Sequence, residues 1–189
     1  MAKRQDLPPT PDKAIWLFAY GSIMWNPGFA YAECAPALLH GWHRAFCIYS
    51  YRYRGTPEKP GLVLGLDRGG SCRGVAFRLP EAEASAILVQ CDERELVTGV
   101  YLRRLVTIRI GDRRLSCWTY VTDRAHKQYA GKLSEAEKTR LIAQGVSPSG
   151  ASNVEYLKNT LSHLAELGIH DPYLRRLWQR VAGLGQGES

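Results

Sequence analysis

The sequence lacks any apolar run long enough to cross a membrane. Its longest uninterrupted apolar stretch covers residues 14–20, whereas a spanning helix needs about 20 apolar residues. Lys3 and Arg4 could imitate the start of a signal peptide, but Asp6, three prolines and Asp12 follow them in place of an apolar segment. We therefore expect a cytoplasmic protein with no secretion signal and no membrane partner.

The sequence is also poor in the patterns that hold metals, disulfides or nucleotides. Its five cysteines (34, 47, 72, 91 and 117) are odd in number and never spaced as C-x-x-C, so neither a disulfide framework nor a zinc site is indicated. The five histidines show no metal-ligand spacing, and neither a Walker loop, a G-x-G-x-x-G motif nor an H-E-x-x-H motif occurs. The prediction is a protein with reduced thiols, no metal and no cofactor.

The positive charge is not concentrated. The formal net charge is +7, which is compatible with nucleic-acid binding. However, the basic residues are spread thinly, and the small clusters are Arg103/Arg104, Arg113/Arg114 and Arg175/Arg176/Arg180. Such charge serves equally well to attract a small anion, so no nucleic-acid partner is predicted. No oligomeric state is predicted either.

What the sequence does contain is typical of one soluble globular domain. It has 189 residues, of which 45% are hydrophobic and 23% charged, and a chain of this length can bury a sizeable core. Residues 1–12 have three prolines and no periodic apolar face, so they predict a flexible lead-in. We place the domain at residues 13–183 and a short tail at 184–189.

The first two thirds of the sequence favour strands. Residues 15–20 form a short apolar run closed by Gly21-Ser22, and residues 43–49 resemble a second strand. Residues 62–66 and 74–79 flank a glycine-rich segment, 67–71, that predicts a hairpin turn. Pro80 opens a predicted helix that ends near Cys91. Residues 101–110 and 115–121 predict a second hairpin around Gly111-Asp112.

The last third favours helices. Ser134-x-x-Glu137 and Ser152-x-x-Glu155 have the capping-box pattern, and Gly145 and Gly168 stand where the two helices would end. A third helix begins at Asp171-Pro172. Strands followed by helices, with one helix inserted, predict an α+β fold: a mixed, mostly antiparallel sheet curled into a small barrel with flanking helices.

The turn Tyr20-Gly21-Ser22-Ile23 is the first candidate site. A glycine directly after a buried strand lets the backbone approach a ligand closely, and successive N–H groups in such a turn can bind an anion. The alternative is that Gly21-Ser22 simply ends a strand, which is the commoner role of glycine turns. These four residues do not decide between the two.

Other candidates are polar side chains in predicted loops. Glu95 ends the charged segment Asp92-Glu93-Arg94-Glu95, which reads as a solvated turn unless partial burial at the entrance to the following strand raises the pKa of Glu95 and makes it a better base. Arg54 and Tyr129 also lie in predicted loops, where ligand contacts concentrate. A nucleophile pair of Cys47 with His43 stays open, although no third orienting group is identified.

Five ordered segments together resemble the ChaC-like γ-glutamylcyclotransferases, which degrade glutathione. The resemblance covers about residues 15–178 and rests on the following segments: Phe18-Ala19-Tyr20-Gly21-Ser22-Ile23-Met24-Trp25-Asn26-Pro27, Arg54-Gly55-Thr56-Pro57, Gly74-Val75-Ala76-Phe77-Arg78-Leu79-Pro80, Asp92-Glu93-Arg94-Glu95, and the C-terminal run from Ser149 to Asp171.

The resemblance implies a lyase that converts glutathione to 5-oxoproline and Cys-Gly. It makes Glu95 the catalytic acid/base, residues 20–23 (Tyr20, Gly21, Ser22 and Ile23) the holder of the γ-glutamyl group, and Tyr129 a substrate contact. Arg54 is expected to bind the glycyl carboxylate. The sequence departs from the family after Glu95 and before Tyr129. The alternatives are therefore a cyclotransferase for other γ-glutamyl amino acids or amines, and a non-catalytic binding module of the same fold.

Overall fold

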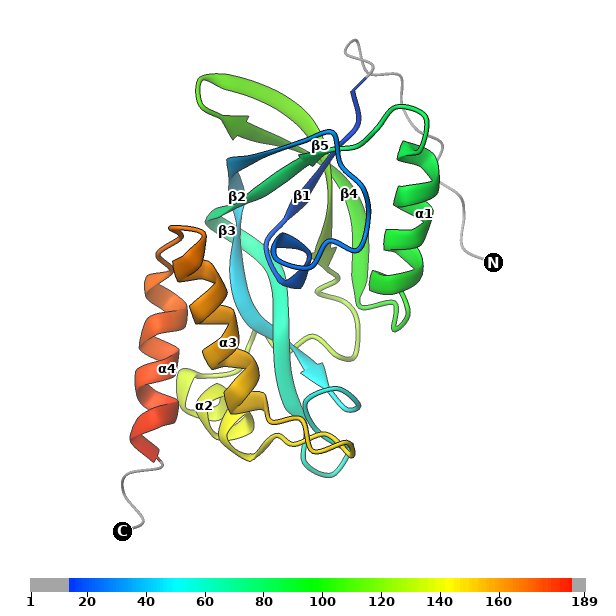
Figure 1. The fold of residues 1–189 in the computed structure, drawn as a ribbon. Coiled ribbons are helices and arrows are strands. Elements are labelled where there is room, and N and C mark those ends of the chain that lie inside the picture. Colours follow the sequence, from blue (N-terminus) through cyan, green and yellow to red (C-terminus); the bar gives the residue numbers. More distant parts are fainter. Residues whose placement is uncertain (1–13, 185–189) are drawn as a thin grey trace.

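The chain forms a closed five-stranded barrel with helices around it (Figure 1). A computed structural model describes residues 14–184. The strand order is β1-β3-β2-β4-β5, in which β1 runs parallel to β5 and the other neighbours are antiparallel. The strands are β1 (Trp16–Ala19), β2 (Glu33–Ser50), β3 (Gly61–Arg78), β4 (Tyr101–Ile110) and β5 (Arg113–Thr122). This confirms the predicted fold class.

The helices cover two sides of the barrel (Figure 1). α1 (Ala84–Glu95) stands apart from the others, whereas α2 (Glu135–Gln144), α3 (Asn153–Glu166) and α4 (Pro172–Leu184) gather beside β2 and β3. α4 packs through Leu174, Leu177 and Val181, which are buried as their helical spacing predicts. None of the helices within residues 14–184 is both long and apolar enough to cross a membrane.

The predicted helix starts in the last third match the structure. Ser134 caps α2, and both bonds of its capping box with Glu137 are present. Ser152 caps α3 by accepting hydrogen bonds from the N–H groups of Val154 and Glu155. These caps fix where the helices begin and therefore how the C-terminal cluster meets the barrel.

The hairpin turn predicted at residues 67–71 is wrong. β3 runs without interruption through this segment and stays paired with β2 on both sides of it. Gly69 and Gly70 have φ values of 98° and 67° and lie near Gly41, whose φ is 80°, where the pairing register of β2 and β3 shifts. The glycines therefore bend two long paired strands instead of reversing the chain.

The helix predicted from Pro80 begins and ends later than expected. Residues 81–83 form a turn closed by a bond from the Glu83 N–H to the Pro80 carbonyl, and α1 then runs from Ala84 to Glu95. The segment Asp92–Glu95, expected to be a charged turn at the entrance to a strand, is the last turn of this helix. Glu95 is consequently held on a rigid element.

Two predicted boundaries reach beyond the described part of the chain. The lead-in predicted at residues 1–12 lies outside the described residues, as does the tail predicted at 184–189 apart from Leu184, which is the last residue of α4. Within the described range, every residue of β1 is buried between β3 and β5. The turn that follows β1 therefore begins at a strand that is held in place by the core.

Candidate active site

The turn after β1 is a tight helical turn anchored in the core. Gly21 precedes the short helix η1 (Ser22–Met24), and the Met24 N–H donates to the Gly21 carbonyl at 2.9 Å. Ile23 and Met24 are buried and hold the turn against the barrel. The first N–H groups of a helical turn have no acceptor within it. They are consequently available to an anionic group of a ligand.

This turn and Glu95 line the same small cavity, of about 50 Å³. The predicted site residues Tyr20, Gly21, Ser22 and Ile23 line it together with Glu95. Residues separated by more than 70 positions in the sequence are thus brought together. The remaining lining residues are Phe18, Ala19, Leu64, Tyr101, Tyr120 and Tyr156.

A larger groove of about 620 Å³ lies elsewhere, between β2 and β4. Arg104, Arg109, Arg114 and His40 line it, and no carboxylate does. Its size alone does not make it an active site. The smaller cavity is the better candidate because it joins a backbone anion site to a titratable carboxylate.

Glu95 is largely withdrawn from water. Only 19% of its side chain is exposed, and Oε1 lies 3.2 Å from Nε of Arg94. Burial raises the pKa of the Glu95 carboxyl above its ordinary value, and the neighbouring Arg94 charge offsets this rise in part. A carboxylate with a raised pKa is a stronger base once it is deprotonated.

Several tyrosines line the cavity together with Glu95. Tyr101 donates to the Leu64 carbonyl at 2.5 Å, and Tyr20 and Tyr156 line the same cavity. Burial raises the pKa of all three tyrosines, that of Tyr156 to about 12. They therefore stay neutral near pH 7 and can act as hydrogen-bond donors or acceptors.

Tyr101, Tyr120 and Tyr156 line the cavity, but they are not among the site residues predicted from the sequence. Tyr101 begins a strand and Tyr156 lies in the first turn of α3, and neither position marks a binding residue in a single sequence. Tyr156 does lie within the C-terminal segment that carries the family resemblance, which was the one available signal.

Arg54 lies next to the cavity wall without lining the cavity. Its guanidinium carbon is 4.8 Å from the ring centroid of Tyr156, and Nη1 donates to the Ser152 carbonyl at 3.4 Å. The loop that carries Arg54 is tightly folded, because a Cβ at Gly55 would collide with the backbone at Gly61. Arg54 is therefore held on the outer face of Tyr156.

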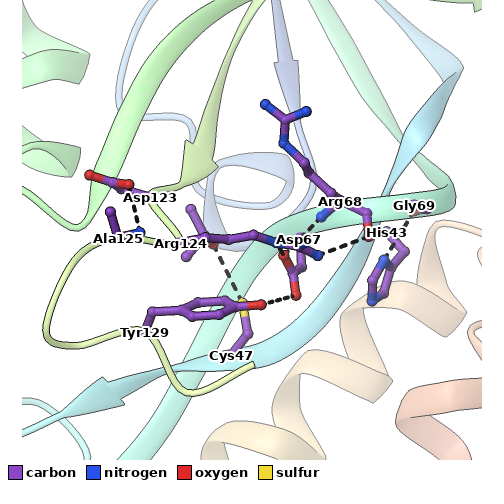
Figure 2. A network of polar contacts seen from close by, with 10 residues as sticks. His43, Cys47, Asp67, Arg68, Gly69, Asp123, Arg124, Ala125 and Tyr129 are labelled. Carbon is purple, nitrogen blue, oxygen red and sulfur yellow. Dashed lines mark hydrogen bonds and ion pairs between the residues drawn. The ribbon is translucent and has the colours of Figure 1, made fainter. Parts of the chain in front are cut away.

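Tyr129 belongs to a different polar cluster (Figure 2). Its hydroxyl donates to Asp67 Oδ2 at 2.8 Å, while Arg124 Nε and the Arg68 N–H bind Oδ1 at 2.6 and 2.8 Å. Asp67 is only 6% exposed. The structure does not bring Tyr129 to the cavity that contains Glu95.

Cys47 and His43 do not form a nucleophile pair (Figure 2). Sγ of Cys47 lies 3.4 Å from Oγ1 of Thr122, whereas Nδ1 of His43 lies 3.0 Å from the Gly69 carbonyl oxygen. Burial raises the pKa of the Cys47 thiol to about 12, which keeps it protonated and unreactive. Within residues 14–184, no group of three or more His, Cys, Asp or Glu residues could hold a metal ion.

The chain matches one known protein family over nearly all of its described residues. Residues 15–184 match the family model described as ChaC-like protein. The chain is 37% identical over 176 residues to the glutathione-specific gamma-glutamylcyclotransferase of Escherichia coli, covering 92% of this chain and 76% of that protein. It is 33% identical over 181 residues to glutathione-specific gamma-glutamylcyclotransferase 1 of Rattus norvegicus, covering 91% and 80% respectively.

A solved structure supports the fold. The crystal structure of a γ-glutamyl cyclotransferase specific to glutathione from yeast superimposes with a TM-score of 0.80 at 24% identity, covering 91% of this chain and 97% of that one. At this identity the likeness concerns the fold alone. Together with the family model and the sequence identities, these findings show that the chain belongs to the ChaC-like family of proteins.

Proposed function

We propose that this protein is a glutathione-specific γ-glutamylcyclotransferase that releases 5-oxoproline and Cys-Gly. The observation that carries the proposal is the shared cavity, in which the turn at residues 20–23 faces the half-buried carboxylate of Glu95. The names of the E. coli and rat relatives support glutathione as the substrate.

The chemistry requires positioning and proton transfer. The α-amine of the γ-glutamyl group attacks its own γ-carbonyl carbon, so a new C–N bond closes the five-membered ring. The amide bond to cysteine then breaks, and the departing nitrogen takes up a proton. No water is consumed. Well-oriented intramolecular reactions reach effective molarities on the order of 10⁵–10⁸ M, so holding the glutamyl chain in a folded shape accounts for much of the acceleration.

In this proposal, Glu95 moves the protons. The α-amine is protonated near neutral pH and becomes a nucleophile only after it loses a proton, which Glu95 accepts. The attacking nitrogen loses a second proton as the ring closes, and Glu95 returns a proton to the cysteinyl nitrogen as the amide bond breaks. The second proton goes to the freed amine of Cys-Gly. General acid–base catalysis of this kind contributes roughly 10²–10⁴-fold. The partial burial of Glu95 favours this role because it weakens the ordinary preference of the carboxyl for its charged form.

The turn at residues 20–23 holds the polar head of the substrate. Its N–H groups are suited to the α-carboxylate of the glutamyl group or to the oxyanion that develops on the γ-carbonyl. Tyr20, Tyr101 and Tyr156 supply neutral hydroxyls around the ring-closing atoms. These aromatic side chains also exclude water from the reacting group.

Arg54 and Tyr129 are proposed as contacts for the rest of glutathione. Arg54 lies against Tyr156, where its charge is suited to the glycyl carboxylate. Tyr129 is proposed on the family resemblance alone. Its hydroxyl is bonded to Asp67, so binding glutathione would require that bond to open.

Product analysis tests the proposed reaction. Purified protein is incubated with glutathione in water enriched in ¹⁸O, and the products are quantified by mass spectrometry. We expect equimolar 5-oxoproline and Cys-Gly, both without label. Formation of glutamate carrying ¹⁸O would indicate hydrolysis and would contradict the mechanism.

A second candidate is a cyclotransferase for other γ-glutamyl compounds. An Arabidopsis thaliana relative that is 28% identical is named gamma-glutamylcyclotransferase 2-3, with no substrate in its name. A panel of γ-glutamyl amino acids and amines, assayed for 5-oxoproline, separates the two candidates. Turnover of the panel at rates matching glutathione would favour the broader activity.

The cytoplasm is the proposed location. All five cysteines are free, and four of them are buried. Reduced thiols are typical of the cytosol.

A further inference from the structure

One side chain, that of Arg94, connects the two halves of the candidate active site. Its Nη2 donates to Ser22 Oγ at 2.8 Å, and its Nη1 donates to the carbonyls of Asn26 and Pro27 at 3.1 and 3.4 Å. Its Nε lies 3.2 Å from Oε1 of Glu95. A single guanidinium therefore contacts both the substrate-holding turn and the carboxylate opposite it.

The pairing of Arg94 with Glu95 is not an ordinary helix-surface pair. Adjacent residues of a helix point in different directions and do not normally face each other. Here the two side chains meet in the last turn of α1, where a cation is also favoured by the helix dipole. An exposed ion pair on its own would contribute little to stability. The contacts of Arg94 are therefore better explained by what they hold in place.

We propose that Arg94 is a positioning residue that fixes the turn carrying the substrate's γ-glutamyl group at the correct distance from Glu95. This inference rests on the proposed function, because it takes Glu95 as the acid/base. Without Arg94, the two sides of the cavity come from separate elements, the segment after β1 and the end of α1. With it, they form one rigid unit.

The role requires the shape of arginine. The guanidinium is planar and presents its donors in a fixed fork, so it can serve the hydroxyl, the two carbonyls and the carboxylate at once. A lysine ammonium is a compact charge on a flexible stem. Lysine at this position could keep a charge beside Glu95, but it could not reproduce the three bonds to residues 22–27.

The same guanidinium also affects the ionisation of Glu95. The titratable groups that line the cavity with Glu95 from other elements are the hydroxyls of Tyr20, Tyr101, Tyr120 and Tyr156, all neutral near pH 7 because burial raises their pKa. The thiol of Cys91 on α1 is also kept neutral, since burial raises its pKa to about 11. Arg94 is the cation that lowers the pKa of Glu95 against the effect of burial.

Gln90 provides a matched control. It lies one helical turn before Arg94 on α1, and its Nε2 donates to the Gly28 carbonyl at 3.0 Å. It therefore ties the same segment to the same helix, but it lies outside the cavity lining and carries no charge. Gln90→Ala removes a tether without touching Glu95 or Ser22.

The test compares the pH dependence of glutathione turnover in wild type, Arg94→Lys, Arg94→Gln and Gln90→Ala. Misplacing reacting groups by about 1 Å can cost roughly 10²-fold in rate, so we expect kcat/KM of Arg94→Lys to fall by roughly 10- to 100-fold with its acidic limb unmoved. Arg94→Gln should also lose rate, and its acidic limb should move to higher pH because the cation that favours the Glu95 carboxylate is gone. Gln90→Ala should keep the wild-type pH profile, and its kcat/KM should be much higher than that of either Arg94 variant.

Two results would overturn the inference. One is a kcat/KM of Arg94→Lys equal to that of wild type, and the other is an acidic limb that does not move in Arg94→Gln. Circular dichroism and Tm report whether each variant folds. If Arg94→Gln does not fold, Ser22→Ala takes its place in the rate comparison. This substitution removes the hydrogen bond that Arg94 donates to Ser22 and should also lower kcat/KM. An unchanged kcat/KM would count against the positioning role of Arg94.

A second readout separates this inference from the proposed function. If the wild type does not cleave glutathione, the proposed function fails. The positioning role of Arg94 is then tested in the substrate-free protein. Amide hydrogen exchange at residues 21–28 should be faster in Arg94→Lys than in Gln90→Ala, and the Glu95 carboxyl, followed by ¹³C NMR, should titrate at higher pH in Arg94→Gln. Unchanged exchange and an unchanged titration would overturn the inference on their own.

Discussion

Two carboxylates of the molecule, Glu95 and Asp67, lie in outwardly similar surroundings, with side chains that are 19% and 8% exposed. Glu95 lies beside Arg94 in a cavity lined by four tyrosines, whereas Asp67 lies beside Arg124 and Tyr129. Each carboxylate has an oxygen within 3.2 Å of the Nε atom of an arginine. Residue types alone would not tell them apart.

Their hydrogen bonds distinguish them. Asp67 accepts bonds from Arg124, Tyr129 and the Arg68 N–H, and these lower the pKa of its carboxyl although burial acts to raise it. Among residues 14–184, Arg94 is the charged residue that acts on Glu95, and burial leaves the pKa of Glu95 raised. We therefore propose that Asp67 stabilises the fold and that Glu95, which has fewer hydrogen-bond donors, exchanges protons with the substrate.

The largest expected effect is on turnover. Glu95→Gln should lower kcat by roughly 10²–10⁴-fold, the contribution of a general acid/base, because glutamine cannot accept and return the proton. Asp67→Asn, assayed well below its Tm, should stay far closer to wild type. The measurement is the initial rate of 5-oxoproline release at saturating glutathione. Equal losses in the two variants would remove the distinction between the two carboxylates.

The next effect is on stability. Asp67→Ala leaves Tyr129 and the Arg68 N–H without their buried acceptor, so the free energy of unfolding should fall by about 2 kcal/mol. Because the folded pKa of Asp67 is lowered, its contribution is present above the unfolded value of about 3.9 and is lost as the pH falls through the folded value. Urea unfolding at neutral and acidic pH measures both.

Arg124→Gln is the control for that experiment. The Arg124 side chain is 47% exposed, so solvent screening limits its ion pair with Asp67 to about 0–1 kcal/mol. A larger loss in Arg124→Gln than in Asp67→Ala would mean that the surface charge, and not the buried acceptor, stabilises this cluster.

Removal of the Arg54 charge should mainly weaken substrate binding. If Arg54 binds the glycyl carboxylate in the ground state, Arg54→Ala should raise KM by about tenfold, the cost of one charged hydrogen bond, with little change in kcat. Steady-state kinetics with glutathione measure both constants. An unchanged KM would exclude Arg54 from the substrate site.

Tyr129→Phe tests which cluster the tyrosine serves. Loss of its bond to Asp67 should lower the free energy of unfolding by about 1 kcal/mol, and loss of a substrate contact should raise KM. We expect both changes. Unchanged stability would show that the bond to Asp67 contributes nothing, and an unchanged KM would assign Tyr129 to the Asp67 cluster alone.

The smallest effect should be a gain in stability at Glu95. Since its folded pKa is raised, the folded state binds more protons than the unfolded chain between the two pKa values, and stability falls as the pH rises through that window. At neutral pH the charged carboxylate therefore costs free energy. Glu95→Gln should raise Tm, by no more than about 2–4 °C, which is roughly 1 kcal/mol for a chain of this size. A lower Tm would contradict the assignment of Glu95 as the poorly bonded carboxylate.

Local chemistry made much of the fold predictable. The apolar run of β1, the two-residue turn at Gly111-Asp112 and the cap at Ser134 each depend on neighbouring residues, and the structure confirms them. The prediction of a hairpin turn at residues 67–71 was wrong because the same glycines can reverse a chain or bend a strand. Only the pairing of β3 with β2 along its whole length decides which occurs.

The candidate site was predictable in part for a similar reason. Glu95 and residues 20–23 were identified through the family resemblance, and the structure brings them to one cavity. The lining by Tyr101 and Tyr156 depends on tertiary packing that brings the start of β4 and the first turn of α3 to one cavity, which no local pattern records. The same holds for Asp67, which appeared to be part of a turn and is instead a buried acceptor in the middle of β3.

The most direct measurement is the pKa of Glu95 in the free enzyme. It can be determined by ¹³C NMR of the labelled carboxyl and compared with the acidic limb of kcat/KM for glutathione. We expect a pKa above the ordinary 4.5 that coincides with that limb, and we expect the limb to disappear in Glu95→Gln together with the activity. A Glu95 pKa at or below the ordinary value, or an acidic limb that persists at full activity in Glu95→Gln, would contradict the role of Glu95 as the acid/base.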